Sequence, residues 1–310
     1  MRLLNWFKSL LMVSLLAGLA ACGGGDDDPP TIVDLARSDA RFSVLAEALQ
    51  AAELTDTLSG TGPYTVFAPT DAAFTALLAE LQLTKAQLLA DKTLLRAVLQ
   101  YHVLSSAVPK SAVPAGKAIS PLAGGIFKVD AQGSDLVVTD GRNRTARITE
   151  TDLSARNGLV HVVDKVLLPA NKTLVQTAQG VPAFSTLVEA VVAANLQGTL
   201  SGTGPFTVFA PTNDAFAALL VELGVSKDAL LANKPLLTQV LTYHVVPGRV
   251  LKADVPVGAP ITTLQGETFT VNANLAITDQ RMRSARITGT DVLTSNGVIH
   301  VIDRVILPRP

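Results

Sequence analysis

The chain has 310 residues, of which 48% are hydrophobic, and it carries 25 basic and 26 acidic side chains. A formal net charge of −1 gives no general attraction to nucleic acid, and a single cysteine excludes an intramolecular disulfide. The length is sufficient for two domains that each have a hydrophobic core.

The first 21 residues have the pattern of a secretory signal peptide. Arg2 and Lys8 flank the start of the chain, and Leu10 to Leu19 is an apolar run too short to span a bilayer comfortably. The segment that ends in Ala20-Ala21-Cys22 resembles the lipobox of bacterial lipoproteins. This resemblance implies cleavage before Cys22 and acylation of that residue, including with palmitate. An ordinary secreted protein with one spare thiol is the alternative.

Residues 22–30 are predicted to form an acylated flexible tether, because they consist of glycines, aspartates and two prolines after the cysteine. The membrane, reached through this lipid anchor, is thus the first expected partner. We expect a protein of the bacterial cell envelope, and Gly23 directly after the cysteine favours the outer membrane. Loss of the signal peptide leaves 23 basic side chains against 26 acidic ones, so the folded part is close to neutral.

The rest of the chain is one unit written twice. LSGTGPYTVFAPT at 58–70 recurs at 200–212 with one change in thirteen positions, and NGLVHVVDKVLLP at 157–169 recurs as NGVIHVIDRVILP at 296–308 with eight identities. The predicted domains are therefore residues 31–169 and 173–308. Each is long enough for its own core, so a tandem duplication of a whole domain is indicated rather than a solenoid.

Each unit begins with helices and ends with strands. Phe42, Leu45, Ala46 and Leu49 follow helical spacing, and the same pattern recurs from Phe184. A short strand precedes each second helix, and β-branched runs fill the second half of each unit. Helices followed by strands in one compact unit favour an α+β fold.

The four histidines are two positions that each occur twice. In the closing strand of each unit, alternation of side chains places His161 and Asp164, or His300 and Asp303, on opposite faces. A histidine that acts as a base needs an orienting partner within reach, so we interpret these as buried residues with hydrogen bonds to the backbone. No catalytic residue, metal ligand or cofactor is predicted, although a hydrolase or isomerase that uses His102 and His244 is the third hypothesis.

A basic strand recurs in each unit. Arg142 and Arg144, with Arg281 and Arg283 in the second copy, would share one face of a strand. They are the predicted anion contacts of a glycan-binding or small-ligand-binding module of the cell envelope. A charged edge strand that is protected from aggregation is the alternative.

Three repeated blocks resemble the fasciclin (FAS1) family: TVFAPTDAAF at 65–74, Tyr-His-Val at 101–103 and the closing strand, each with its second copy. The resemblance covers nearly the whole mature chain. It implies two tandem α+β domains, each a wedge of two β-sheets flanked by helices. It also implies a role in adhesion without enzymatic activity.

The resemblance further implies contact residues. In animal relatives, adhesive contacts involve an Asp-Ile pair before the last block and the Tyr-His block. The matching positions here are Asp152, Leu153, Asp291, Val292, Tyr101, His102, Tyr243 and His244. The alternative for the two aspartates is a turn residue whose carboxylate caps local backbone. Buried core aromatics are the alternative for the tyrosines.

The leading hypothesis is a surface-anchored, non-enzymatic adhesion or interaction protein that contacts cells, matrix or envelope. Its expected partner is an extracellular or envelope protein or a polysaccharide. Glycan or small-ligand binding through the arginines is the alternative function.

Overall fold

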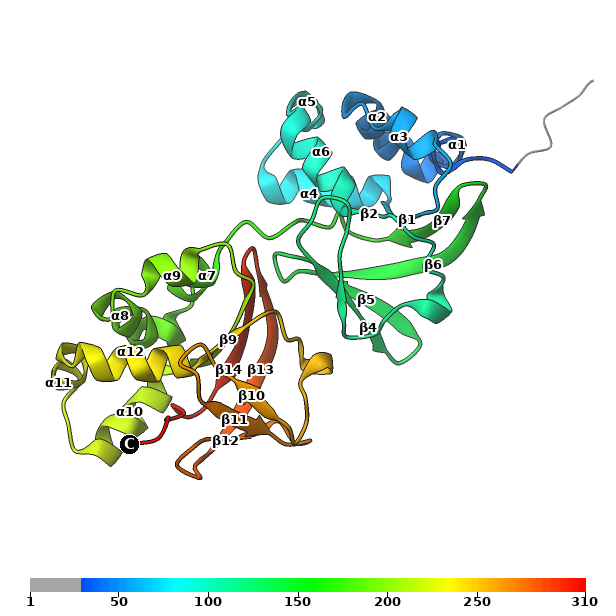
Figure 1. The fold of residues 1–310 in the computed structure, drawn as a ribbon. Helices are drawn as coiled ribbons and strands as arrows, with labels where there is room; N and C mark the ends of the chain where they lie inside the picture. The colour runs from blue at the N-terminus through cyan, green and yellow to red at the C-terminus, as the bar shows by residue number, and fades with distance from the viewer. Residues whose placement is uncertain (1–28) are drawn as a thin grey trace, which may run out of the picture.

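The computed structural model describes residues 29–310, which form two similar units of helices and strands (Figure 1). The predicted signal peptide, Cys22 and most of the predicted tether lie outside the described residues. Within the described part, no helix has both the length and the apolar character needed to cross a bilayer. The fold therefore concerns the two repeated units.

The first domain contains the following elements: α1 (Ile32–Ser38), the 3-10 helix η1 (Ala40–Phe42), α2 (Ser43–Ala51), α3 (Thr55–Ser59), β1 (Tyr64–Pro69), α4 (Asp71–Leu81), α5 (Lys85–Ala90), α6 (Lys92–Tyr101), β2 (Val103–Leu104), η2 (Lys110–Ala112), β3 (Ala118–Ile119), β4 (Phe127–Gln132), β5 (Asp135–Thr139), β6 (Thr145–Ala155) and β7 (Gly158–Val163).

The second domain repeats this order: α7 (Leu174–Gln179), η3 (Pro182–Phe184), α8 (Ser185–Ala193), α9 (Gln197–Ser201), β8 (Phe206–Pro211), α10 (Asn213–Leu223), α11 (Lys227–Ala232), α12 (Lys234–Tyr243), β9 (Val245–Pro247), η4 (Lys252–Asp254), β10 (Pro260–Thr262), β11 (Thr268–Val271), β12 (Ala276–Thr278), β13 (Ser284–Thr294) and β14 (Gly297–Ile302).

Helix starts follow from the local sequence. Thr70 and Thr212 are the N-caps of α4 and α10, where each hydroxyl accepts the backbone N–H three residues on. Thr31 and Thr84 form capping boxes with Asp34 and Gln87 at the starts of α1 and α5. The helical half of each unit is therefore specified by its caps as well as by its apolar spacing.

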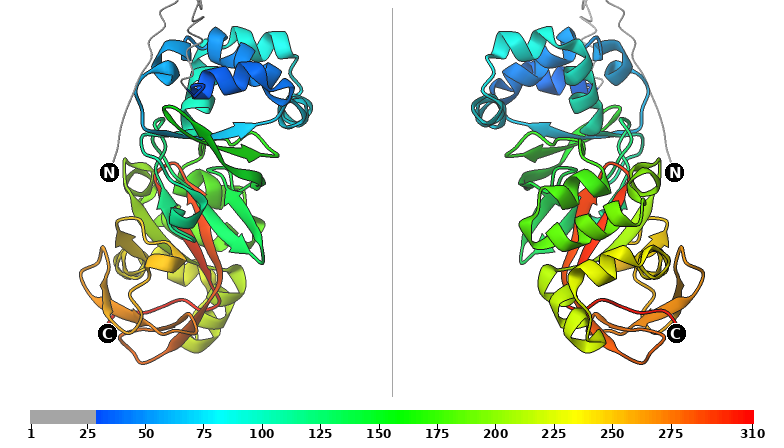
Figure 2. Two further views of the ribbon diagram at one scale, coloured as in Figure 1. Left: turned by 90° about the vertical axis from the view of Figure 1, so that its right-hand side faces the viewer. Right: turned by 90° about the vertical axis from the view of Figure 1, so that its left-hand side faces the viewer.

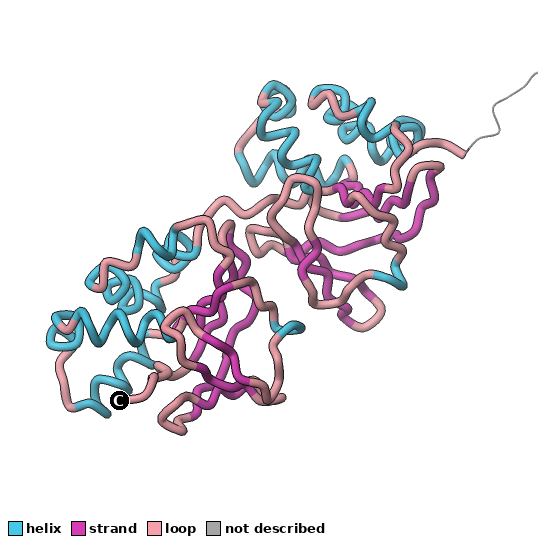
Figure 3. Tube along the Cα trace, in the orientation of Figure 1, coloured by secondary structure: helices cyan, strands magenta, loops and turns pink. Residues whose placement is uncertain are grey.

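Each domain has one seven-stranded sheet, in the order β2-β1-β7-β6-β5-β4-β3 and β10-β11-β12-β13-β14-β8-β9. The closing strand lies near the middle, parallel to β1 or β8 and antiparallel to β6 or β13. Helices gather on one side of each sheet (Figure 3). The predicted α+β class is confirmed. The closing strand of the first domain is buried, because its side chains belong both to the core beneath the helices and to a second core formed with β3, β4 and β5.

The two halves of the predicted wedge are joined by one long strand. The first residues of β6, up to Ile148, pair with β5, and the segment from Ile148 to Ala155 pairs with β7. Register shifts fall between Ile148, Glu150 and Leu153, and β13 has the same irregularity. A bulge bends a strand and increases its twist, so the two halves turn relative to each other without a break in the strand order.

The two domains contact each other directly (Figures 1 and 2). The β13–β14 hairpin reaches the first domain, where Leu293 exchanges two hydrogen bonds with the Asn143 side chain at 2.6 and 3.0 Å. Ile126 of the first domain packs with three buried residues of the second, namely Leu251, Leu293 and Val298. A short connection and an apolar contact with its own hydrogen bonds therefore hold the pair together.

Candidate functional site

Asp152 and Asp291 occupy the same bulge in the two long strands β6 and β13. Both have a left-handed backbone with φ of 61°. Both backbone N–H groups donate to a histidine Nδ1, from Asp152 to His161 at 3.2 Å and from Asp291 to His300 at 3.3 Å. The bulge explains the position, because it re-aims one side chain out of the strand's alternation. The alternative of a turn residue whose carboxylate caps local backbone is wrong for both, because they lie within strands and their carboxylates bind backbone that is distant in sequence.

Each aspartate carboxylate holds a loop that is distant in sequence. Asp152 Oδ1 accepts the backbone N–H of Lys110 at 2.9 Å, and Asp291 Oδ1 accepts that of Lys252 at 2.7 Å. The same loops accept a ring N–H from the histidines, at Val108 for His161 (2.9 Å) and Val250 for His300 (2.8 Å). The histidine of the closing strand is thus a structural bridge that fixes the bulge and the loop together.

The two carboxylates differ in what their second oxygen meets. Asp291 is only 5% exposed, and its Oδ2 accepts the Lys128 ammonium of the first domain at 2.9 Å. Burial lowers the pKa of Lys128, but its bonds to Asp291 and Asp130 outweigh that effect and leave the pKa raised. Asp152 is exposed, and within residues 29–310 its Oδ2 has no hydrogen-bond partner. The carboxylate of Asp291 is therefore occupied by a lysine of the other domain, whereas the carboxylate of Asp152 is open to solvent.

The surroundings of the two aspartates differ in the same way. Leu251, Leu293 and Val298 make the second copy apolar, and Ile126 covers them. Their counterparts in the first copy are Pro109, Ser154 and Leu159, none of which is fully buried. We call the exposed Asp152 and Ser154, together with the half-buried Pro109 and Leu159, the open face.

Leu153 and Val292, the residues after the aspartates, are half-buried against the helical side of their own domains. Strand alternation explains this placement, because neighbours of an outward-pointing residue face the core. The Asp-Leu and Asp-Val pairs therefore do not form a joint surface.

The predicted contact residues of the Tyr-His block lie in the core. Tyr101 and Tyr243 are fully buried, and their hydroxyls donate to the carbonyls of Ile126 and Thr268. Burial raises the pKa of both tyrosines. The interpretation of these tyrosines as core aromatics is confirmed, and a partner could reach them only after local unfolding.

His102 and His244 are each 1% exposed and neutral. His102 Nδ1 donates to Val98 O at 2.7 Å, and its Nε2 accepts the N–H of Leu167 at 2.8 Å. His244 makes the same pair of bonds to Val240 and Ile306. Burial lowers the pKa of both histidines to about 4. The buried, backbone-bonded interpretation is confirmed.

The predicted placement of the arginines on a strand is wrong. Arg142 and Arg144 lie in the turn before β6, where Asp140 Oδ1 accepts both of their backbone N–H groups at 2.9 Å. An Asx-type turn competes with strand extension at that point. Arg281 and Arg283 repeat the turn on Asp279 before β13.

The two arginines of each turn also point to different partners. Arg144 forms ion pairs with Asp140 and Glu80, and Arg283 lies 3.1 Å from Glu222. Arg142 and Arg281 instead donate from Nε to the carbonyls of Pro169 and Pro308, at 3.4 and 2.9 Å. The arginines therefore do not act as adjacent pairs.

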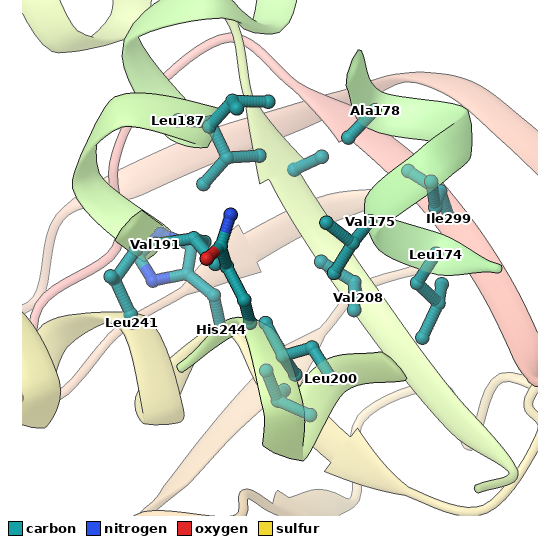
Figure 4. A pocket seen from close by; sticks show the side chains of 14 residues that line it. Leu174, Val175, Ala178, Leu187, Val191, Leu200, Val208, Leu241, His244 and Ile299 are labelled. Atoms are coloured by element: carbon teal, nitrogen blue, oxygen red, sulfur yellow. The ribbon is translucent and has the colours of Figure 1, made fainter. Parts of the chain in front are cut away.

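An apolar cavity of about 40 Å³ lies between α7, α8 and the sheet of the second domain, with His244 at its wall (Figure 4). The first domain has a similar cavity of about 50 Å³ beside His102. Such volumes hold little more than a water molecule, and their linings are almost wholly apolar. Among residues 29–310, no three His, Cys, Asp or Glu side chains are grouped to hold a metal ion.

Lys128 and Asn143 lie at the contact between the domains, and no pattern in the sequence predicted them as contact residues. Their counterparts in the second copy are Thr270 and Met282. The difference in residue type between the two copies at these positions is the signal that could have pointed to them.

The chain matches the model of the fasciclin domain twice, over residues 40–169 and 182–308. It is similar to protein sll1483 of Synechocystis sp., with 48% identity over 148 residues that cover 47% of this chain and 79% of that protein. It is also similar to human periostin, with 27% identity over 288 residues, which are 91% of this chain but only 32% of periostin.

Among solved structures, the chain is similar to a FAS1 domain pair from the insect cell adhesion molecule fasciclin I. The match has 20% identity and a TM-score of 0.44, and it covers 86% of this chain and 95% of that chain.

Proposed function

The chain belongs to the fasciclin domain family, and on that premise we propose that it is a surface-anchored, non-enzymatic adhesion protein of the bacterial cell envelope. Fasciclin domain proteins are often adhesion or interaction proteins. The relatives include human periostin, of whose length the chain covers 32%. The lipobox-like segment at Cys22 supports attachment through acyl chains. More than one acyl chain makes such membrane attachment stable.

One observation carries the choice of surface: the second copy of the Asp152 bulge already forms a contact between the two domains. Asp291 binds Lys128 of the first domain, and Leu293 pairs with Asn143. In the first domain the equivalent carboxylate is held in the same geometry by Lys110 but is exposed. We assign the open face as the surface that contacts a partner.

A second copy of this chain does not fit that surface in the same way. Lys128, which binds Asp291, and Asn143, which binds Leu293, are already engaged within the chain. The second domain offers Thr270 and an exposed Met282 at the matching positions, neither of which can donate a charged hydrogen bond. The partner is therefore a different molecule of the envelope or matrix that presents a cationic group to Asp152.

Adhesion of coated beads tests this proposal. Beads that carry the chain from residue 22 onward are applied to cells of the source organism and to their extracellular matrix. Asp152→Asn is expected to lower the apparent affinity about ten-fold, because a charge-assisted hydrogen bond is lost. The matched control is Asp214→Asn, which changes an exposed aspartate of the second domain that has no side-chain partner among the described residues.

Equal adhesion by wild type and Asp152→Asn would remove the open face as the contact. Absence of adhesion by the folded wild-type protein to cells and to matrix alike would remove the proposed function.

A further inference from the structure

A cleft of about 450 Å³ lies between the two domains, beside their connection. The turn before β6 supplies Arg142 and Asn143, the connection supplies Asn171 and Lys172, and the start of the second domain supplies Thr177 and Val181. Val292 and Leu293 of β13 complete the wall. The volume is in the range of small-molecule sites, and the cleft exists only because the domains are paired.

The cleft is basic and lacks a compensating acid. No aspartate or glutamate lines it. Arg142 donates from Nε to Pro169 O, which directs the guanidinium, and its two terminal nitrogens have no acceptor within the described part of the chain. Lys172 likewise has no ion pair among residues 29–310. By contrast, Arg144, which lies in the same turn as Arg142, forms two ion pairs. A concave site with walls of low dielectric strengthens the attraction of such a pair for an anion.

The fixed backbone around Arg142 keeps the cleft in shape. Gly141 packs so closely on the connection that a Cβ there would lie 2.3 Å from the Ala170 nitrogen. On the other side, Ser295 donates its N–H to Lys172 O at 2.8 Å, and Asn143 holds Leu293. Both walls and the floor are therefore tied together by hydrogen bonds between the domains and their connection.

The remaining lining suits a carbohydrate. The Asn171 amide and the Thr177 hydroxyl make no hydrogen bond within the described residues, so both are available for hydroxyl groups. Val181 and Val292 are half-buried and offer apolar surface of the kind that covers the C–H face of a sugar ring. The planar fork of an arginine matches a carboxylate with two parallel hydrogen bonds.

We propose that this interdomain cleft binds an acidic sugar, with the carboxylate on Arg142 and Lys172 and the hydroxyls on Asn171 and Thr177. The site is separate from the open face and does not depend on it. It replaces the predicted pairs of arginines by a single arginine and a lysine from the connection. A chain with this site would attach to acidic polysaccharide of an envelope or matrix as well as to a protein.

Calorimetric titration of the chain from residue 22 onward with digalacturonate tests the proposal. Binding is expected, and it should weaken steeply between about 50 and about 300 mM salt because the site is partly exposed. Arg142→Gln should weaken it at least about ten-fold. Arg281→Gln is the matched control, since Arg281 makes the equivalent bond to Pro308 but does not line the interdomain cleft. Its affinity should equal that of wild type.

Further arms make each outcome decisive. Lys172→Gln changes an exposed residue and should also weaken binding. It replaces Arg142→Gln as the test if a thermal melt shows that the arginine variant does not fold. Neutral digalactose should bind far more weakly than digalacturonate. The proposal is overturned if digalacturonate does not bind, if digalactose or inorganic phosphate binds equally well, or if the Arg142 and Arg281 variants behave alike.

Discussion

Replacement of Asn157 by alanine is expected to lower the free energy of unfolding by about 3 kcal/mol. Its side chain is buried and joins three segments of the first domain. Oδ1 accepts the N–H of Ile32 at 3.0 Å, and Nδ2 donates to Leu58 O at 2.7 Å and to Gly60 O at 2.8 Å. Alanine would leave these three backbone groups without a partner, two of them in a buried environment.

Asn296 makes the same three bonds in the second domain, to Leu174, Leu200 and Gly202. Asn296→Ala should therefore have an effect of the same size. Asn274→Ala, at an exposed position of a turn, is the control and should stay within about 0.5 kcal/mol of wild type. Denaturant unfolding of the four proteins measures this, and a loss below about 1 kcal/mol for both buried variants would show that these bonds contribute little.

A fall in pH from 7 to 5 is expected to cost each domain about 2 kcal/mol through one histidine. Burial lowers the pKa of His102 and His244 from 6.5 to about 4 in the folded chain. The unfolded chain therefore binds more protons between these values. The stabilisation is fully present above pH 6.5 and is lost as the pH falls toward 4. The main physical reason is burial, which disfavours the charged ring, and a proton on Nε2 would also break the bond from the backbone N–H that this atom accepts.

Denaturant unfolding at pH 7 and pH 5 checks this expectation, with NMR titration of the imidazole signals as a direct readout. His102→Gln lowers the stability at both pH values but should reduce the loss between them by about 2 kcal/mol, because one titrating group is gone. If His102 and His244 titrate near pH 6.5 in the folded protein, the account of their burial is wrong.

The fold could be predicted from the sequence because the chain contains two copies of the same domain, and each copy shows the same pattern of helices and strands. The repeated block at 157–169 contains Asn157 and Gly158, and both have a physical role that fixes the turn between β6 and β7. A Cβ at Gly158 would lie 2.0 Å from Tyr64 O, so the close approach of the strands requires glycine. The period-two pattern likewise placed His161 inside the sheet, where it is 1% exposed.

The site was predictable only in part. The position of Asp152 and Asp291 was predicted, but the left-handed bulge that aims them outward was not, because an aspartate in a strand pattern carries no mark of a bulge. The open or covered state of each carboxylate depends on contacts between residues far apart in sequence. Lys128 reaches Asp291 across 163 positions, and such pairing follows from the domain arrangement rather than from local pattern.

At the turn arginines, hydrogen bonds from the backbone to a nearby aspartate decide the structure, and the alternating pattern typical of a strand does not. Arg142 and Arg144 alternate as strand residues do, but Asp140 precedes them and binds both of their N–H groups. Aspartate before a β-branched run is a turn signal that outweighs alternation at the end of a strand. The same reasoning applies to Asp279, so the two copies agree in their departure from the prediction.

Carboxyl footprinting tests the central claim most directly, namely that Asp152 is open for a partner while Asp291 is covered by the first domain. The protein is treated with a carbodiimide and excess glycinamide, free in solution and attached to its target cells or matrix, and labelled peptides are quantified by mass spectrometry. The account predicts that Asp152 is labelled in the free protein and protected on attachment, whereas Asp291 stays protected in both states. Labelling of Asp291 as fast as that of Asp152 in the free protein, or undiminished labelling of Asp152 on attachment, would contradict it.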